Sequence, residues 1–185
     1  MIKSLVTSQV EIVKPEPEHV DAVYVMRQQL AHMRHNPLRA MSKSDFSVGY
    51  LESGSDLADW ESCPIFRWTV LWNGEPVGSV SLKDISTMML TGEIGYGIDE
   101  RFHGKGIATE AVRLLVAKVF QETPLRKITA LIHDQNTSSC RLVEKLGFIR
   151  EGLLREQFLI QGEPVNELFY GLLRSEWKVD GKFES

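Results

Sequence analysis

The 185-residue sequence predicts one α/β (α+β) domain with a mixed, mostly antiparallel central sheet. Segments of alternating or continuous apolar residues, typical of strands, are interspersed with segments of helical periodicity. Asn73-Gly74 separates two strand-like segments and indicates a tight hairpin. The length suits a single domain, and no repeat, linker or low-complexity tract divides the chain. We therefore expect one domain over residues 1–185, with a core from about 9 to 177.

The first half of the chain supplies four predicted strands, at residues 9–15, 65–72, 76–82 and 92–98. One helix is expected between the first two strands, beginning near His19 and ending before Asn36-Pro37. Apolar residues recur in it at helical spacing, namely Val23, Met26, Leu30 and Met33. Residues 39–63 are polar and stay unassigned, except for a helical part at 56–60.

The second half begins with the strongest helical pattern, where Ala111, Leu115 and Val119 form one apolar stripe. A buried strand is expected at residues 127–133. Asn136 or Thr137 can cap a following helix that continues through Lys145. A hairpin over residues 158–173 completes the order β-α-(α)-β-β-β-α-β-α-β-β. This gives about six to seven strands and about four helices.

Composition excludes several functional classes. Hydrophobic residues make up 43% and the net charge is −4, which disfavours a broad nucleic-acid surface. Two cysteines provide neither a disulfide framework nor zinc spacing. No signal peptide or membrane-length apolar run is present, so we expect a soluble cytoplasmic protein. His32 and His35 have the spacing of a helical metal pair but lack partners, so we expect no metal and a surface location.

The stretch RFHGKGIATEA, residues 101–111, predicts a phosphate site. Glycines let backbone amides approach a ligand, and a helix N-terminus adds unpaired N–H groups. Glycines that merely start a helix are the alternative explanation. A P-loop is excluded because Gly106, and not Ser or Thr, follows Gly104-Lys105. The dinucleotide motif is excluded because Thr109 occupies the place of its third glycine.

Two motifs resemble those of the Gcn5-related N-acetyltransferase (GNAT) superfamily. Arg101, Gly104 and Gly106 fill its R-x-x-G-x-G pattern after a glycine-bearing strand. NTSSCRLVEKLGFIREG, residues 136–152, is similar to its second signature, N-x-x-S followed by E-K-L-G-F. EIGYGIDERFHGKGIATEA resembles the RimJ/RimL-like branch, which acetylates N-terminal residues of ribosomal proteins. The likeness spans about residues 9–177 and is strongest over 92–152.

This resemblance implies a GNAT fold, with the sheet splayed between its fourth and fifth strands, and acetyl-coenzyme A (acetyl-CoA) as cosubstrate. Backbone contacts from the fourth strand to the pantetheine arm fall on Tyr96, Gly97 and Ile98, and a side-chain contact falls on Asn136. The loop that holds the pyrophosphate corresponds to Arg101, His103, Gly104, Lys105, Gly106, Ile107, Ala108 and Thr109. Lys105 could add a charge contact or remain a solvated loop lysine.

The resemblance implies the catalytic residues less directly than the cofactor-binding residues, because one residue common in the family is absent from this chain. Many relatives place a proton-donating tyrosine seven residues after the asparagine, but Val143 stands there in this chain. Ser139, at the N-x-x-S position, is the substitute favoured by the resembling branch, and a structural role at the helix start is its alternative. Glu93 and Glu156 are the candidate general bases. Both could instead be exposed sheet residues, with the proton leaving through a water chain.

The resemblance implies transfer of an acetyl group to a primary amine by direct attack, with a protein N-terminus such as that of a ribosomal protein as acceptor. A small cationic amine (a polyamine, an aminoglycoside or an amino-acid derivative) is the alternative acceptor. A non-catalytic regulatory module that binds acyl-CoA is the rival from another class. We expect no nucleic-acid or membrane partner. The sequence does not decide whether the protein forms a homodimer.

Overall fold

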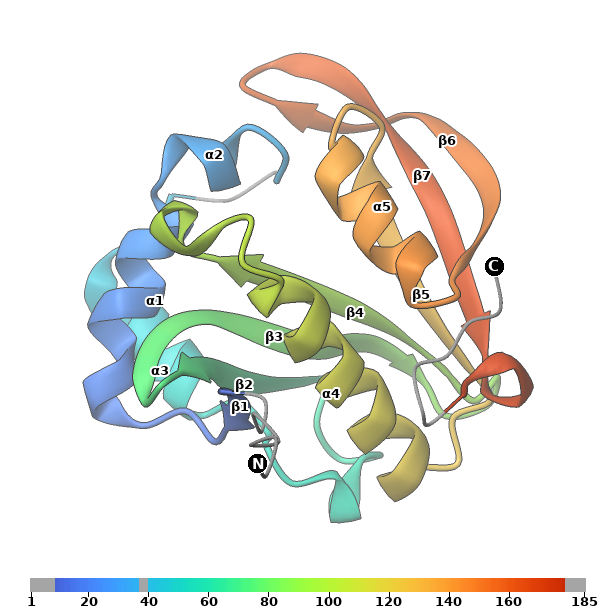
Figure 1. Cartoon of the computed structure of the whole chain (residues 1–185), viewed down its shortest axis with the longest axis horizontal. Helices are drawn as coiled ribbons and strands as arrows, with labels where there is room; N and C mark the ends of the chain where they lie inside the picture. The colour runs from blue at the N-terminus through green and yellow to red at the C-terminus, as the bar shows by residue number, and fades with distance from the viewer. Residues whose placement is uncertain (1–8, 37–39, 179–185) are drawn as a thin grey trace, which may run out of the picture.

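The computed structural model describes residues 9–36 and 40–178, and Figure 1 shows their arrangement. Seven strands form one sheet in the order β1-β2-β3-β4-β5-β7-β6. Only β4 and β5 run parallel, which confirms the mixed, mostly antiparallel sheet. The strands are β1 (Val10–Val13), β2 (Ile65–Trp72), β3 (Glu75–Ser86), β4 (Thr91–Ile98), β5 (Lys127–His133), β6 (Ile149–Ile160) and β7 (Glu163–Leu173).

Helices cover both faces of the sheet. The main core lies beneath α4 (Ile107–Glu122) and α5 (Thr137–Lys145), and it includes the predicted stripe of Ala111, Leu115 and Val119. A smaller core joins α1 (Val20–Arg27) to α3 (Lys43–Leu51). Ile98 of β4 belongs to the main core, whereas a Cβ at the preceding Gly97 would meet His32 and Met26. Successive strand residues face opposite sides, so α1 and α4 lie on different faces.

The helix predicted over residues 19–36 is interrupted, which corrects the sequence-based assignment. After α1, Gln29 adopts an extended conformation (φ −67°, ψ 139°), and a short α2 (Leu30–Met33) follows. The Gln29 side chain accepts a hydrogen bond from the backbone N–H of Glu100 at 3.0 Å. Leu30, one of the four apolar residues at helical spacing, is 76% exposed. A contact between segments distant in sequence therefore replaces one turn of helix.

The unassigned polar segment holds α3. Ser42 caps this helix by accepting the N–H of Asp45, and Phe46 and Tyr50 are its buried residues. Two buried aromatic rings suffice to dock a helix whose remaining surface is largely polar. The helical part expected at 56–60 is one 3-10 turn, Leu57–Asp59, with Asp56 as its cap. In the ranges described, no helix is long and apolar enough to cross a membrane.

The sheet opens between β4 and β5. The two strands pair at three positions only, Thr91, Gly92 and Glu93 with residues 127–129. Figure 1 shows them close together at this end and far apart at the other. The carboxyl half of β4 therefore pairs with β3 on one side and has no strand on the other. This opening is the splay that the resemblance implied.

Candidate active site

A cavity of about 520 Å³ lies where the sheet opens, between the end of α2, the β4–α4 loop and α5. The structure brings most of the predicted cofactor residues to its wall, although they come from three separate segments. These residues are Tyr96, Gly97, Ile98, His103, Gly104, Gly106, Ile107, Ala108, Thr109, Asn136 and Ser139.

The β4–α4 loop presents unpaired backbone amides to this cavity. Gly104 and Gly106 have φ angles of 75° and 77°, a conformation that favours glycine. Within the described ranges, the N–H groups of residues 104–109 donate to no other protein group. Helix N-termini leave such amides free and carry partial positive charge. The loop can therefore bind an anion with several converging donors.

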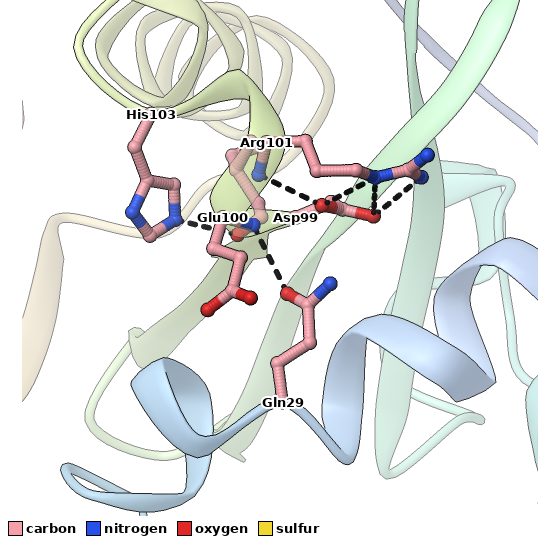
Figure 2. Close-up of polar contacts among 6 residues, drawn as sticks. Gln29, Asp99, Glu100, Arg101 and His103 are labelled. Atoms are coloured by element: carbon pink, nitrogen blue, oxygen red, sulfur yellow. Dashed lines mark hydrogen bonds and ion pairs between the residues drawn. The ribbon is translucent and has the colours of Figure 1, made fainter.

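Side-chain contacts fix the 3-10 turn Glu100–Phe102 that precedes the loop (Figure 2). The buried carboxylate of Asp99 accepts the backbone N–H of Arg101 at 2.9 Å and its Nη2 at 2.7 Å. These hydrogen bonds from Arg101 lower the pKa of Asp99 to about 2. His103 Nε2 lies 2.8 Å from the carbonyl oxygen of Ile98, which ties the turn back to β4.

Three positions of the predicted phosphate loop already have contacts within the protein. The amides of Arg101 and His103 already donate to Asp99 and to the Glu100 carbonyl. Nζ of Lys105 lies 4.6 Å from the centroid of the Trp72 ring, and its charge contact with the pyrophosphate stays a prediction. Neither Arg101 nor Lys105 lines the cavity. They instead hold the outer side of the loop through an ion pair and a cation–π contact.

Asn136 and Ser139 meet Tyr96 across the opening of the sheet. The Asn136 side chain caps α5 by accepting the Ser139 N–H at 3.2 Å, and all three residues line the cavity. The Tyr96 hydroxyl donates to the Ser139 carbonyl at 3.4 Å. Burial raises the pKa of Tyr96 to about 12, so this phenol stays protonated at neutral pH. The capping role of Asn136 leaves its amide N–H groups available to a ligand.

The two predicted general bases lie outside the cavity. Glu93 is largely buried and forms an ion pair with Lys83 at 2.5 Å. Glu156 is exposed at an irregularity of β6, with a φ of 50°, and its N–H donates to Asn166 Oδ1 at 3.0 Å. The structure therefore places neither carboxylate against the groups assigned to the cofactor.

His32 and His35 were expected on the surface, but both line the cavity. Burial lowers the pKa of His32 to about 4, with further contributions from the charges of Arg27 and His103. His32 reaches Gly97 because the break at Gln29 redirects the chain after α1. Periodicity alone gave no signal of this turn.

Several positively charged residues and one face of α5 also line the cavity, and the sequence did not predict them. Arg34 lies on one side, and Arg141 and Lys145 lie on α5. Together with the free amides, these side chains give the cavity the positive character that phosphate groups require. The helical spacing of Ser138, Arg141, Leu142 and Lys145 on α5 was the signal available in the sequence.

A comparison with family descriptions decides the family. The acetyltransferase (GNAT) domain description matches residues 9–149, which is well over half of the chain. The chain belongs to the GNAT acetyltransferase family.

Curated GNAT relatives match over part of their length. Bacillus subtilis YdaF, provisionally named as a ribosomal N-acetyltransferase, is 33% identical over 59% of this chain and 60% of its own. B. subtilis YjcK, also named as an N-acetyltransferase, is 45% identical over 46% and 48%. Spermidine N(1)-acetyltransferase of Escherichia coli K12 is 28% identical over 63% and 62%. The chain thus spans about half to three fifths of these relatives.

Solved structures resemble this GNAT chain over nearly its full length. Ribosomal-protein-S5-alanine acetyltransferase from Vibrio fischeri aligns with a TM-score of 0.79 at 21% identity, covering 93% of this chain and 97% of its own. RimL, the ribosomal L7/L12 α-N-protein acetyltransferase, was solved in complex with coenzyme A. It aligns with a TM-score of 0.79 at 17% identity, covering 91% and 96%. These alignments confirm the GNAT fold.

Proposed function

We propose that this chain transfers the acetyl group of acetyl-CoA to a primary amine. The observation that carries the proposal is the row of unpaired amides at residues 104–109, of which all but Lys105 line the cavity at the opening of the sheet. A diphosphate needs several converging N–H donors, and this loop supplies them without side-chain obstruction at its glycines. Membership of the GNAT family, whose enzymes use acetyl-CoA, supports the same cosubstrate.

The bound cosubstrate would extend from the loop along the free side of β4. The pyrophosphate would lie against Gly104, Gly106 and the first turn of α4, and the pantetheine arm against Tyr96 and Gly97. A backbone N–H of this part of β4 would stabilise the negative charge that develops on the thioester oxygen. Ser139 would protonate the departing thiolate, because this residue lines the cavity beside Asn136.

A protein N-terminus is the acceptor we propose. YdaF is provisionally named for a ribosomal substrate, and the names of two structural neighbours specify ribosomal proteins. A polyamine is the second candidate, because the spermidine acetyltransferase of E. coli is also similar to this chain. Release of free thiol from acetyl-CoA, measured with N-terminal peptides, spermidine, an aminoglycoside and amino-acid derivatives, separates these acceptors.

The same measurements test the non-catalytic alternative. Binding of coenzyme A followed by calorimetry, with thiol release on at least one amine, is the result expected for an enzyme. Binding without thiol release across the panel would indicate a regulatory module that senses acyl-CoA. Absence of binding would contradict the proposal entirely.

A further inference from the structure

Two histidines and an aspartate connect the cavity to the buried end of β5. His35 lines the cavity, and its Nδ1 lies 3.0 Å from Nδ1 of His133, the last residue of β5. On the opposite side of the His133 ring, Nε2 lies 3.6 Å from Oδ1 of Asp134. His133 is 7% exposed, and its Nε2 is buried without a hydrogen-bond partner in the described structure.

The position of Asp134 is itself fixed. Its Oδ2 accepts a hydrogen bond from Asn166 Nδ2 at 3.1 Å, and its backbone N–H donates to the Asn166 carbonyl. Asn166 belongs to β7, next to β5 in the sheet. The carboxylate is therefore held beside His133 by the strand framework and does not depend on the loop at the cavity.

The 3.6 Å approach of Asp134 to His133 is longer than a hydrogen bond, but its electrostatic effect favours one tautomer of each ring. A carboxylate beside Nε2 of His133 favours a proton on that nitrogen, since an unprotonated nitrogen there would place two acceptors together. Nδ1 of His133 is then an acceptor, and Nδ1 of His35 must donate to it. A neutral His35 with its proton on Nδ1 has an unprotonated Nε2. That nitrogen has no hydrogen-bond partner among residues 9–36 and 40–178.

We propose that His35 is the general base that removes a proton from the acceptor amine, and that His133 is a positioning residue that fixes its tautomer. This inference rests on the proposed function, and it replaces Glu93 and Glu156 in the role that the sequence suggested. His35 is the member of the chain of contacts that lines the cavity, whereas Glu93 is already paired with Lys83.

The electrostatic surroundings keep His35 neutral. Burial, the neighbouring His133 and the charge of Arg34 all lower the pKa of His35 below its ordinary value. The carboxyl group of Glu167, opposite His133 in the β5–β7 register, is buried, which raises its pKa to about 7. Among residues 9–36 and 40–178, the titratable and charged groups that line the cavity with His35 or adjoin His133 are His32 and Arg34 near α2, Tyr96 on β4, His103 in the loop, Asp134 after β5, Glu167 on β7, and Arg141 and Lys145 on α5.

The proton balance of the reaction assigns one proton to His35. Nε2 of His35 takes a proton from the substrate ammonium, which leaves a neutral amine. The amine nitrogen forms a bond to the thioester carbonyl carbon, and the carbon–sulfur bond breaks. The nitrogen passes its second proton to the Ser139 oxygen as the amide forms, while the Ser139 hydroxyl proton goes to the thiolate, so Ser139 ends unchanged. His35 then releases its proton to solvent, so the products are an amide, a free thiol and H⁺.

The His35→Asn substitution tests the role of the ring. The amide that replaces the ring can reproduce the hydrogen bond from Nδ1 but is not basic. We expect His35→Asn and His35→Ala to lower kcat equally, by about 100-fold. Coenzyme A affinity, measured by calorimetry, should stay unchanged and report that the fold is intact. Leu30→Ala, an exposed change on the preceding α2, is the matched control and should retain full kcat.

The pH profile provides the second readout. The wild-type kcat should fall on the acid side with a midpoint below about 6.5, because only neutral His35 accepts a proton. His35→Asn should lose this limb. His133→Phe removes the nitrogen that accepts the hydrogen bond from His35, and it should lower kcat. His133→Asn retains an accepting oxygen and should keep a kcat much closer to that of the wild type, as expected for a positioning residue.

Three outcomes would overturn the inference: unchanged kcat in His35→Ala, recovery of kcat in His35→Asn, or an acid limb that survives both changes. The proposed function would survive each of them. Failure of the wild type to release thiol on any amine would instead remove the proposed function, and the inference with it.

Discussion

Single residues at the cavity combine a structural and a chemical task. Gly104 and Gly106 adopt left-handed backbone conformations, and no atom lies within 4 Å of a Cβ built on either. The space beside them is therefore open to a ligand. Ser139 shows the same combination, because its N–H completes the cap of α5 while the residue lines the cavity.

Gly104→Val should weaken coenzyme A binding by about tenfold or more, which corresponds to about 1.4 kcal/mol or more. The valine side chain would occupy the space next to the unpaired amides. Gly74→Val is a matched control, because Gly74 has a φ of 79°, open surroundings and a place in the distant β2–β3 turn. Calorimetry should show reduced affinity in Gly104→Val only; equal affinities in both variants would contradict the assigned loop.

Ser139→Ala should lower kcat more than tenfold without changing coenzyme A affinity. The substitution removes the hydroxyl group but retains the backbone N–H that Asn136 accepts and the carbonyl that Tyr96 contacts. Steady-state kinetics with a saturating amine measure this effect. Retention of the wild-type kcat would exclude Ser139 as the proton donor.

At the scale of elements, the 3-10 turn Glu100–Phe102 joins the two sides of the cavity. Asp99 and Arg101 fix the turn internally, and the N–H of Glu100 donates to Oε1 of Gln29, which lies between α1 and α2 (Figure 2). The loop that presents free amides is thus coupled to the segment that carries His32 and His35.

Asp99 predicts an acid-dependent loss of stability. Its folded pKa of about 2 is lower than the unfolded value, so its stabilisation is fully present above about pH 4 and is lost as pH falls toward 2. The contribution is about 2 kcal/mol. Urea unfolding of Asp99→Asn should show lower stability than wild type at pH 6 and a flatter dependence on pH below 4. Parallel curves would contradict this account.

Elements with a strong local signal could be predicted from the sequence. Strands β1 to β5 and β7, together with α4 and α5, follow from apolar periodicity, Asn73-Gly74 and the Asn136 cap, whereas β6 was expected only from residue 158 and begins at Ile149. The break at Gln29 could not, because a hydrogen bond to Glu100, 71 residues away, replaces the helical turn. The contact of His35 with His133, 98 residues apart, is equally invisible to local patterns. The free amides of the loop were predictable because glycines and a helix start are local features.

At the scale of the whole molecule, one buried acid opposes folding at neutral pH. Glu167 is 6% exposed, its Oε2 has no hydrogen-bond partner within the described ranges, and the charge of Glu93 adds repulsion. Its pKa, raised to about 7, lies above the unfolded value. Ionisation is therefore easier in the unfolded chain, and stability should fall as pH rises from about 4 to 7.

Glu167→Gln should raise the melting temperature at pH 8 by roughly 5 °C and have little effect at pH 4. The neutral amide removes the cost of burying a charge. Glu163→Gln, an exposed change on the same strand, is the control and should alter neither value. Thermal unfolding at the two pH values measures the difference; equal melting temperatures of Glu167→Gln and wild type at pH 8 would contradict the assignment.

The three-residue pairing of β4 with β5 has a consequence for folding. Two antiparallel blocks of sheet share so few hydrogen bonds that their mutual orientation depends chiefly on the core beneath α4 and α5. A ligand that carries amide groups and binds between β4 and β5 would form hydrogen bonds that no segment of the described polypeptide forms there. Such a ligand would take the place of a strand between β4 and β5, and the melting temperature would then rise with its concentration.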